Sequence, residues 1–240
     1  MTALPNSLED AIVQAKGATQ AAIGQGFSRL TVELVFPELK IMPLAQQFYP
    51  LFQEMGLQFK VYFPDAGAAA LAKRDWDNPD VSIRGLGELK GQIEPDDDAF
   101  LIIEPSAVEV EAVEKLVEAS MGRPVVILNP KLEDIATIGI GYAGRQLRER
   151  FLNTLEACYY LRPMEGAAIR RCYPSAWQVW REIAAGDYEL LTETPTRPQG
   201  EALDRILYSN SEDETLEAAP TKPKKGFLGE LQQFIRALTQ

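Results

Sequence analysis

The sequence predicts an α/β protein with a mostly parallel, Rossmann-like sheet, extended by antiparallel strands in its C-terminal half and followed by a tethered amphipathic helix. Three observations lead to this prediction. Apolar, β-branched runs recur four times, and each ends just before a proline. Helical periodicity follows three of these runs. Beyond Gly144 the pattern changes to short strand-like runs, and residues 226–240 carry a separate apolar stripe.

The four apolar runs have the composition of strands that are buried on both faces of a sheet. A proline directly after such a run cannot extend the strand ladder, but it suits the first turn of a helix because it has no N–H to satisfy. Segments 39–55, 66–75 and 108–121 have helical periodicity, which indicates βα units around a parallel sheet. The runs are Leu30–Phe36, Phe59–Phe63, Phe100–Glu104 and Val125–Asn129, with Val81–Arg84 as a weaker fifth strand.

Further elements complete a domain that we place at residues 1–208. Ser7 is suited to cap an N-terminal helix, which we expect to end near Gly24. Residues 201–208 have the pattern of a closing helix. The C-terminal half contains short, aromatic runs that we expect to form antiparallel strands and a hairpin, at residues 154–161, 168–173, 177–182 and 188–194.

The composition argues against several classes of function. The formal net charge of −11 argues against a general nucleic-acid binder, which needs a basic surface to displace the counterions of phosphate groups. The chain has no histidine, which removes the commonest general base and most zinc sites. We therefore predict a protein that is not an enzyme and that has no metal site and no cofactor.

Localisation can also be predicted from the sequence. No apolar run approaches the ~20 residues that are needed to cross a bilayer. Residues 1–10 lack the basic and apolar segments of a secretory signal. Cys158 and Cys172 belong to no CxxC pair, so we expect reduced structural thiols. We expect a cytoplasmic protein.

Polar side chains stand at the ends of three predicted strands. Asp65, Glu104 and Asn129 follow or end these strands, and the C-terminal ends of parallel strands meet at the edge where open α/β sheets bind ligands. Together with Arg145, they would form a crevice for a small polar or phosphorylated ligand. The alternative is that these side chains cap helices and stabilise loops.

Three glycines, Gly139, Gly141 and Gly144, have the GxGxxG spacing of a dinucleotide-binding loop. The spacing follows a short segment rather than the first strand, and no acidic residue stands about 20 positions further on to hold a ribose. We therefore interpret these glycines as a structural loop, with cofactor binding as the alternative.

The C-terminal segment carries the strongest functional signal. Residues 209–225 form a linker that is first acidic and then basic, through Lys222, Lys224 and Lys225. The following residues place large apolar side chains on one helical face, namely Phe227, Leu228, Leu231, Phe234, Ile235 and Leu238. Such a tethered face is unfavourable unless something covers it. We expect a protein groove or a membrane surface, with docking on the chain's own core as the alternative.

Several segments in a fixed order resemble a known family. They are Phe100–Pro105, Val126–Pro130, Arg148–Phe151 leading into Tyr159–Pro163, Ile169–Pro174 and Trp177–Trp180. In this combination, residues 25–208 resemble a domain family of unknown function from cyanobacteria and chloroplasts, which includes the low photosystem II accumulation assembly factor. The resemblance supplies no active-site residues.

This resemblance implies an accessory factor that helps to assemble a photosynthetic membrane complex. We therefore expect a non-catalytic protein that acts by protein–protein interaction, with peripheral contact at the thylakoid surface through its C-terminal helix. No nucleic acid is expected among its partners. The alternative is a small-molecule or phosphate-ligand binding protein, or an enzyme, that uses the crevice at the strand ends.

Overall fold

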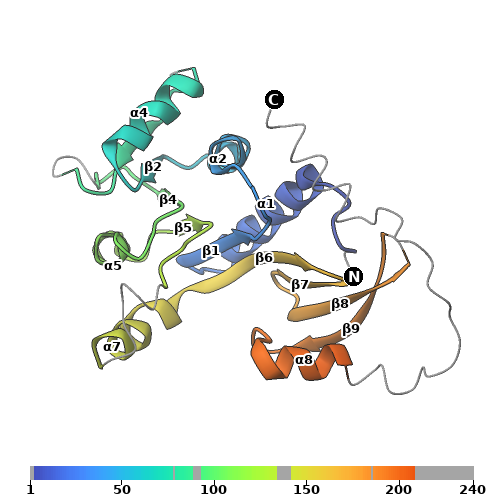
Figure 1. Cartoon of the computed structure of the whole chain (residues 1–240). Helices are drawn as coiled ribbons and strands as arrows, with labels where there is room; N and C mark the ends of the chain where they lie inside the picture. Colours follow the sequence, from blue (N-terminus) through green and yellow to red (C-terminus); the bar gives the residue numbers. More distant parts are fainter. Residues whose placement is uncertain (1–2, 78, 89–92, 134–141, 185, 209–240) are drawn as a thin grey trace, which may run out of the picture.

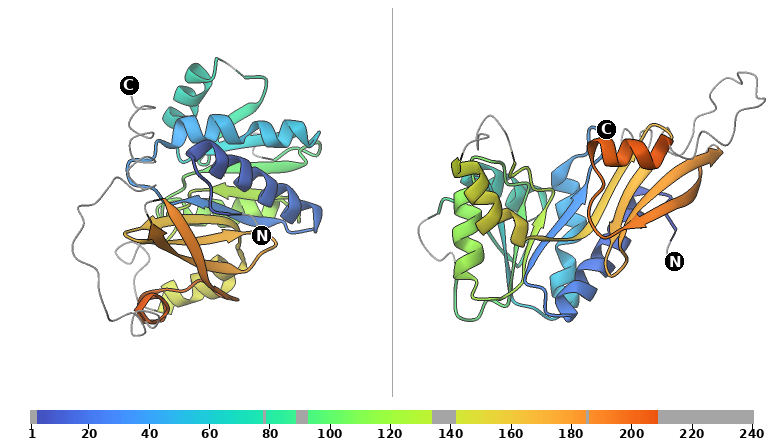
Figure 2. Two further views of the ribbon diagram at one scale, coloured as in Figure 1. Left: turned by 90° about the vertical axis from the view of Figure 1, so that its right-hand side faces the viewer. Right: turned by 90° about the horizontal axis from the view of Figure 1, so that it is seen from below.

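A nine-stranded sheet runs through the molecule and is flanked by helices on both faces (Figure 1). This computed structural model describes residues 3–77, 79–88, 93–133, 142–184 and 186–208. The strand order is β3-β2-β4-β5-β1-β6-β7-β8-β9. The predicted fold class, a mostly parallel sheet extended by C-terminal antiparallel strands, is confirmed. Figure 2 shows β7–β9 on one side of the molecule and the parallel strands with their helices on the other.

The elements follow the expected alternation along the chain. The strands are β1 (Arg29–Leu34), β2 (Phe59–Phe63), β3 (Ser82–Gly85), β4 (Ala99–Ile103), β5 (Val125–Leu128), β6 (Glu156–Met164), β7 (Ala167–Cys172), β8 (Trp177–Ala184) and β9 (Asp187–Thr194). The helices are α1 (Leu8–Gly24), α2 (Ile41–Phe48), α3 (Pro50–Glu54), α4 (Ala66–Asp75), α5 (Val110–Ala119), α7 (Tyr142–Arg150), the 3₁₀ turn η1 (Leu152–Thr154) and α8 (Gly200–Tyr208).

Two details differ from the expected pattern. The helical segment 39–55 is two helices, because Pro50 lacks an N–H for a continuous helix and instead begins α3. Strand β6 was expected in the antiparallel half, but it pairs in parallel with β1 and antiparallel with β7. Helix α7 precedes β6 and carries the chain back to the end of the sheet at which β1 begins. Strand β6 therefore runs beside β1 in the same direction.

The parallel part of the sheet is buried on both faces. One face packs against α1, α2, α3 and α4 around a cluster that includes Val32, Phe48 and Leu101. The opposite face packs against α5 and α7 around Phe100, Val113 and Phe151. Figure 1 shows α8 on the same side as α5 and α7. These layers explain why β4 and β5 are apolar without alternation, and β2 is apolar apart from Lys60: every residue of each of the three strands is buried.

The connections after β1 and β5 diverge. These strands are neighbours, yet β1 leads to α2 on the first face and β5 leads toward α7 on the other. Such a divergence opens a crevice at the C-terminal ends of the two strands, which is where ligands bind in open α/β sheets. The fold therefore places any strand-end site between β1 and β5.

The predicted linker 209–225 and the predicted helix 226–240, with its six apolar residues and its lysines, lie outside the described residues. Among the helices that the structure does describe, none combines the length and the apolar character required to span a membrane.

Candidate functional site

Two adjoining cavities, of about 330 Å³ and about 420 Å³, lie at the divergence of β1 and β5. We call the smaller one the Trp177 cavity and the larger one the Asn129 cavity, after one lining residue of each. Both are lined by Glu33 of β1, Pro130 and Lys131 after β5, and Arg197 after β9. These four residues form the boundary between the two cavities.

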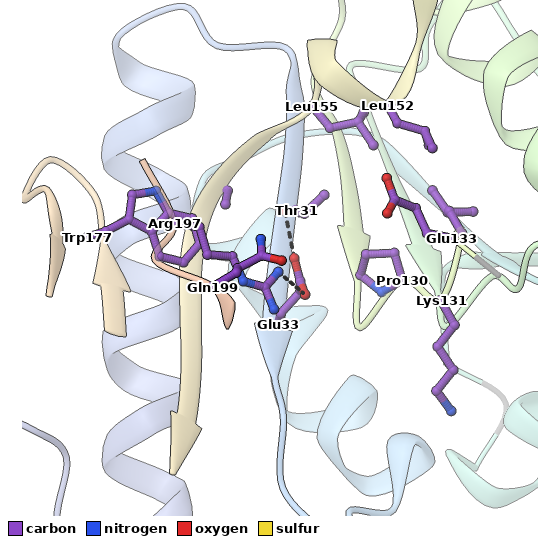
Figure 3. Close-up of a pocket in the computed structure, with 12 residues that line it drawn as sticks. Thr31, Glu33, Pro130, Lys131, Glu133, Leu152, Leu155, Trp177, Arg197 and Gln199 are labelled. Carbon is purple, nitrogen blue, oxygen red and sulfur yellow. Dashed lines mark hydrogen bonds and ion pairs between the residues drawn. The ribbon is translucent and has the colours of Figure 1, made fainter. Parts of the chain in front are cut away.

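The Trp177 cavity lies on the face of the sheet that carries α7 and α8 (Figure 3). One wall holds Leu152 and Leu155, and the opposite wall holds Trp177 at the start of β8. The floor is polar because Thr31 and Glu33 point away from the core of the α1 face, where Leu30, Val32 and Leu34 pack. The cavity therefore combines an apolar wall with charged groups at its boundary.

Arg197 is held by several aromatic and polar contacts. Its guanidinium carbon lies 4.1 Å from the ring centre of Tyr160 and 5.9 Å from that of Trp177. Its Nη2 donates a hydrogen bond to the hydroxyl of Tyr160. Its Nη1 lies 3.9 Å from a carboxylate oxygen of Glu33, too far for a hydrogen bond. The cation is thus well positioned but weakly paired with a carboxylate.

Glu33 is a carboxylate on the polar face of β1, whose other face carries Leu30, Val32 and Leu34. Burial raises the pKa of its carboxyl group above 4.5, and this outweighs the lowering effects of Arg197 and of the hydrogen bond from the Thr31 hydroxyl. Glu133 raises the same pKa further by like-charge repulsion. A perturbed carboxyl in a cavity is a common property of functional sites, although structural ion pairs show it as well.

The Asn129 cavity is bordered by three non-glycine residues with left-handed backbone conformations. Their φ angles are +61° at Glu38, +45° at Glu104 and +48° at Asn129. Such conformations cost free energy and cluster at functional sites. Glu104 and Asn129 directly follow the last residues of β4 and β5, where strand pairing ends.

Both polar atoms of the Asn129 side chain form hydrogen bonds with the backbone of β1. Its amide oxygen accepts a hydrogen bond from the Leu34 N–H at 2.8 Å, and its amide nitrogen donates to the Leu34 carbonyl at 3.0 Å. The side chain thereby continues the β1–β5 ladder one residue past Leu128. Glu104 is likewise engaged, because its carboxylate accepts a hydrogen bond from Lys131.

The structure brings together two of the four residues that were predicted to form the crevice. Glu104 and Asn129 line the Asn129 cavity. Asp65 instead caps α4, where its carboxylate accepts a hydrogen bond from the Ala68 N–H at 2.9 Å. Arg145 is exposed on α7 and lines neither cavity. Of the three glycines, Gly144 is buried within α7, and Gly139 and Gly141 lie outside the described residues.

Sequence reasoning missed Glu33, Tyr160, Trp177 and Arg197. One signal was available, because Glu33 is a charged residue in the middle of a run of apolar strand residues. The other three reach the site from β6, β8 and the segment after β9, so their proximity depends on the order of strands in the sheet. That order was not part of the sequence prediction.

A second cluster of charges lies around β2. Asp97, in the acidic run 96–98, is buried and lies 2.9 Å from the ammonium group of Lys60, which is buried as well. Glu94 also pairs with Lys60 at 2.9 Å. These contacts fix the loop before β4. Within the described parts of the chain, no group of three or more acidic or cysteine side chains is placed to hold a metal ion.

A family model provides the comparison with known proteins. It matches residues 5–205 and is described as a domain of unknown function, DUF1995. The match begins just before α1 and ends within α8, so it includes the whole sheet and both cavities. It agrees with the resemblance to a family of unknown function that the sequence shows. By this match over most of its length, the chain belongs to the DUF1995 family.

Proposed function

We propose that this protein is a non-catalytic accessory factor, akin to photosystem assembly factors, that acts by protein–protein interaction. Its C-terminal helix docks on a partner at the thylakoid surface. The observation that carries the proposal is the apolar stripe from Phe227 to Leu238, which follows an acidic linker in the sequence. A helical face of this size at the end of a tether is typical of a helix that binds in a groove.

The described domain supports this proposal in two ways. Its core residues extend from Leu4 to Trp180 and bury one another on both faces of the sheet. Its last helix, α8, is amphipathic but contains no buried residue, since Leu203, Ile206 and Leu207 are partly exposed and Tyr208 is 69% exposed. The apolar residues of α8, which directly precedes the linker, are therefore partly open to a partner.

The energetics favour reversible docking. A helix of roughly 14 residues is marginal alone in water, because nucleation is costly. Six large apolar side chains would contribute up to ~10 kcal/mol if they were fully buried, and ordering entropy removes much of this. Gln232 and Gln233 occupy the polar face where a strong lipid binder would carry lysines, which favours a protein groove over a bilayer.

The test compares two substitutions that add the same charge to opposite faces of the predicted helix. Phe234→Asp should abolish co-purification of the full-length protein with photosynthetic membrane complexes, whereas Gln233→Asp should retain it. Flotation with anionic liposomes at low and high salt identifies the membrane mode, because salt screens lysine contacts strongly. If Phe234→Asp retains both partner and liposome binding, the helix is not the attachment site.

A further inference from the structure

We propose that the joined Trp177 and Asn129 cavities bind a small organic anion, with a carboxylate or a phosphate ester as its charged group and an apolar body. Arg197 is the residue that would hold the charged group. This inference goes beyond the proposed accessory function and does not depend on the C-terminal helix. It rests on one positioned cation, on an apolar wall beside it, and on the pairing of Glu104 and Glu133 with other cations.

Arg197 has the geometry of a binding group rather than that of a completed ion pair. Within the part of the chain that the structure describes, its buried Nε–H has no hydrogen-bond partner. Leaving such a donor unsatisfied costs about 1–3 kcal/mol. Arg197 lines both cavities, so an anion in either one lies beside its guanidinium. The ring of Tyr160 at 4.1 Å fixes the plane of the guanidinium before any ligand arrives.

Two of the carboxylates around Arg197 pair with other cations. Glu104 is paired with Lys131, and Glu133 lies 3.7 Å from Arg148. Glu33 is the carboxylate nearest to Arg197 in these ion pairs, and its distance of 3.9 Å makes a weak pair. The exposed residues Glu38 and Arg162, of opposite charge, also line the Asn129 cavity.

The apolar part of the ligand is defined by the Trp177 cavity. Leu152, Leu155 and Pro130 face the cavity on one side and Trp177 on the other (Figure 3). A volume of about 330 Å³ has room for roughly ten non-hydrogen atoms, at the ≈30 Å³ that a water molecule occupies in the liquid. A single aromatic ring with one short acidic arm matches this size, with its ring beside Trp177 and its acid at Arg197.

Titration calorimetry with the full-length protein tests the proposal. The probes are phenylacetate and phenyl phosphate, with phenylacetamide as the neutral counterpart and inorganic phosphate as an acid without an apolar body. We expect saturable binding of at least one aromatic acid, and at least tenfold weaker binding of phenylacetamide and of inorganic phosphate. A preference between the two aromatic acids identifies the charged group.

Variants then assign the binding to Arg197. Arg197→Met removes the cation but keeps an apolar stem, and it should weaken binding at least tenfold. Arg181→Met is the matched control, because Arg181 is equally buried, with 31% of its side chain exposed against 32% for Arg197, and also pairs with one carboxylate, that of Glu189. This control should bind as the wild type does.

A third variant keeps the test decisive if Arg197→Met unfolds. Ala157→Leu narrows the Trp177 cavity from its β6 wall without changing any charge, and it should weaken aromatic-acid binding at least tenfold while circular dichroism stays unchanged. The proposal is overturned if neither acid binds the wild type, if phenylacetamide binds equally well, or if the folded Arg197→Met and Ala157→Leu variants both bind as the wild type does.

Discussion

At the scale of single residues, Glu33 shows how position in a sheet changes the pKa of a carboxyl group. Its neighbours Val32 and Leu34 pack in the core, so the strand must carry Glu33 on the opposite face, where the Trp177 cavity lies. The side chain is 21% exposed, and the guanidinium group of Arg197 lies 3.9 Å away. Burial therefore outweighs attraction, and the pKa is raised.

This pKa shift makes the stability contribution of Glu33 depend on pH. Well below its unfolded-state pKa of 4.5, the residue is protonated in both the folded and the unfolded chain. Between 4.5 and its higher folded-state pKa, the folded chain keeps the proton, so stability falls as the pH rises through this window. The substitution Glu33→Gln mimics the protonated acid at every pH, because its amide is neutral and has nearly the same shape.

We therefore expect Glu33→Gln to gain stability relative to the wild type as the pH rises from 4.5 to 7. Urea unfolding at several pH values measures the difference in the free energy of unfolding. Glu201→Gln is the control, because the Glu201 side chain is 90% exposed on α8. A difference that is constant with pH for Glu33→Gln would show that the burial of Glu33 does not perturb its titration.

Residue roles were predictable from the sequence where the local chain decides them. The positions of Glu104 and Asn129 at strand ends follow from the apolar runs before them, and both residues line a cavity. The capping role of Asp65 was one of the two interpretations considered, and a helix start directly after a strand favours it. Arg197 was not predictable in this way, because strand order brings it to Glu33 and Tyr160.

At the scale of elements, the joint between β1 and β5 depends on one side chain. Asn129 adopts a left-handed conformation, and its amide pairs with both backbone groups of Leu34. Leu34 is 1% exposed, so its backbone groups depend on Asn129 for these bonds. The joint holds the two strands together at the point where their connections diverge, and it therefore sets the width of the Asn129 cavity.

Two substitutions separate the components of this joint. Asn129→Gly loses both hydrogen bonds but tolerates φ of +48°, and it should cost about 1–3 kcal/mol, the penalty for unsatisfied buried groups. Asn129→Ala should cost about 1 kcal/mol more, because alanine is strained in the left-handed region. Urea unfolding at neutral pH measures both values. Wild-type stability in Asn129→Gly would mean that the amide bonds to Leu34 contribute nothing.

Elements were predictable where their pattern is local, and pairing was not. The apolar runs before proline become β1, β2, β4 and β5, because strands that are buried on both faces need no alternation. The sequence shows that β6 is strand-like, but its parallel pairing with β1 follows from the path of the chain through α7. The break between α2 and α3 was readable, since Pro50 stands inside the helical segment.

At the scale of the whole molecule, residues 3–208 and the C-terminal segment have different roles in our proposals. The domain supplies both core clusters and both cavities. The C-terminal segment, in our proposal, carries the helix that docks on a partner. These roles are independent, so the domain should fold and bind a small acid without the segment, and the segment should be required for docking.

Deletion of residues 209–240 tests this independence. The core clusters are formed by residues that precede the linker, and an acidic linker has little apolar surface to bury, so the deletion should shift the thermal midpoint by less than ~5 °C. The midpoint can be followed by circular dichroism for the full-length and the shortened chain at equal concentration. A larger drop corresponds to about 2 kcal/mol or more for a domain of this size. It would mean that the apolar stripe covers the chain's own domain, for example the partly exposed residues of α8, rather than a partner.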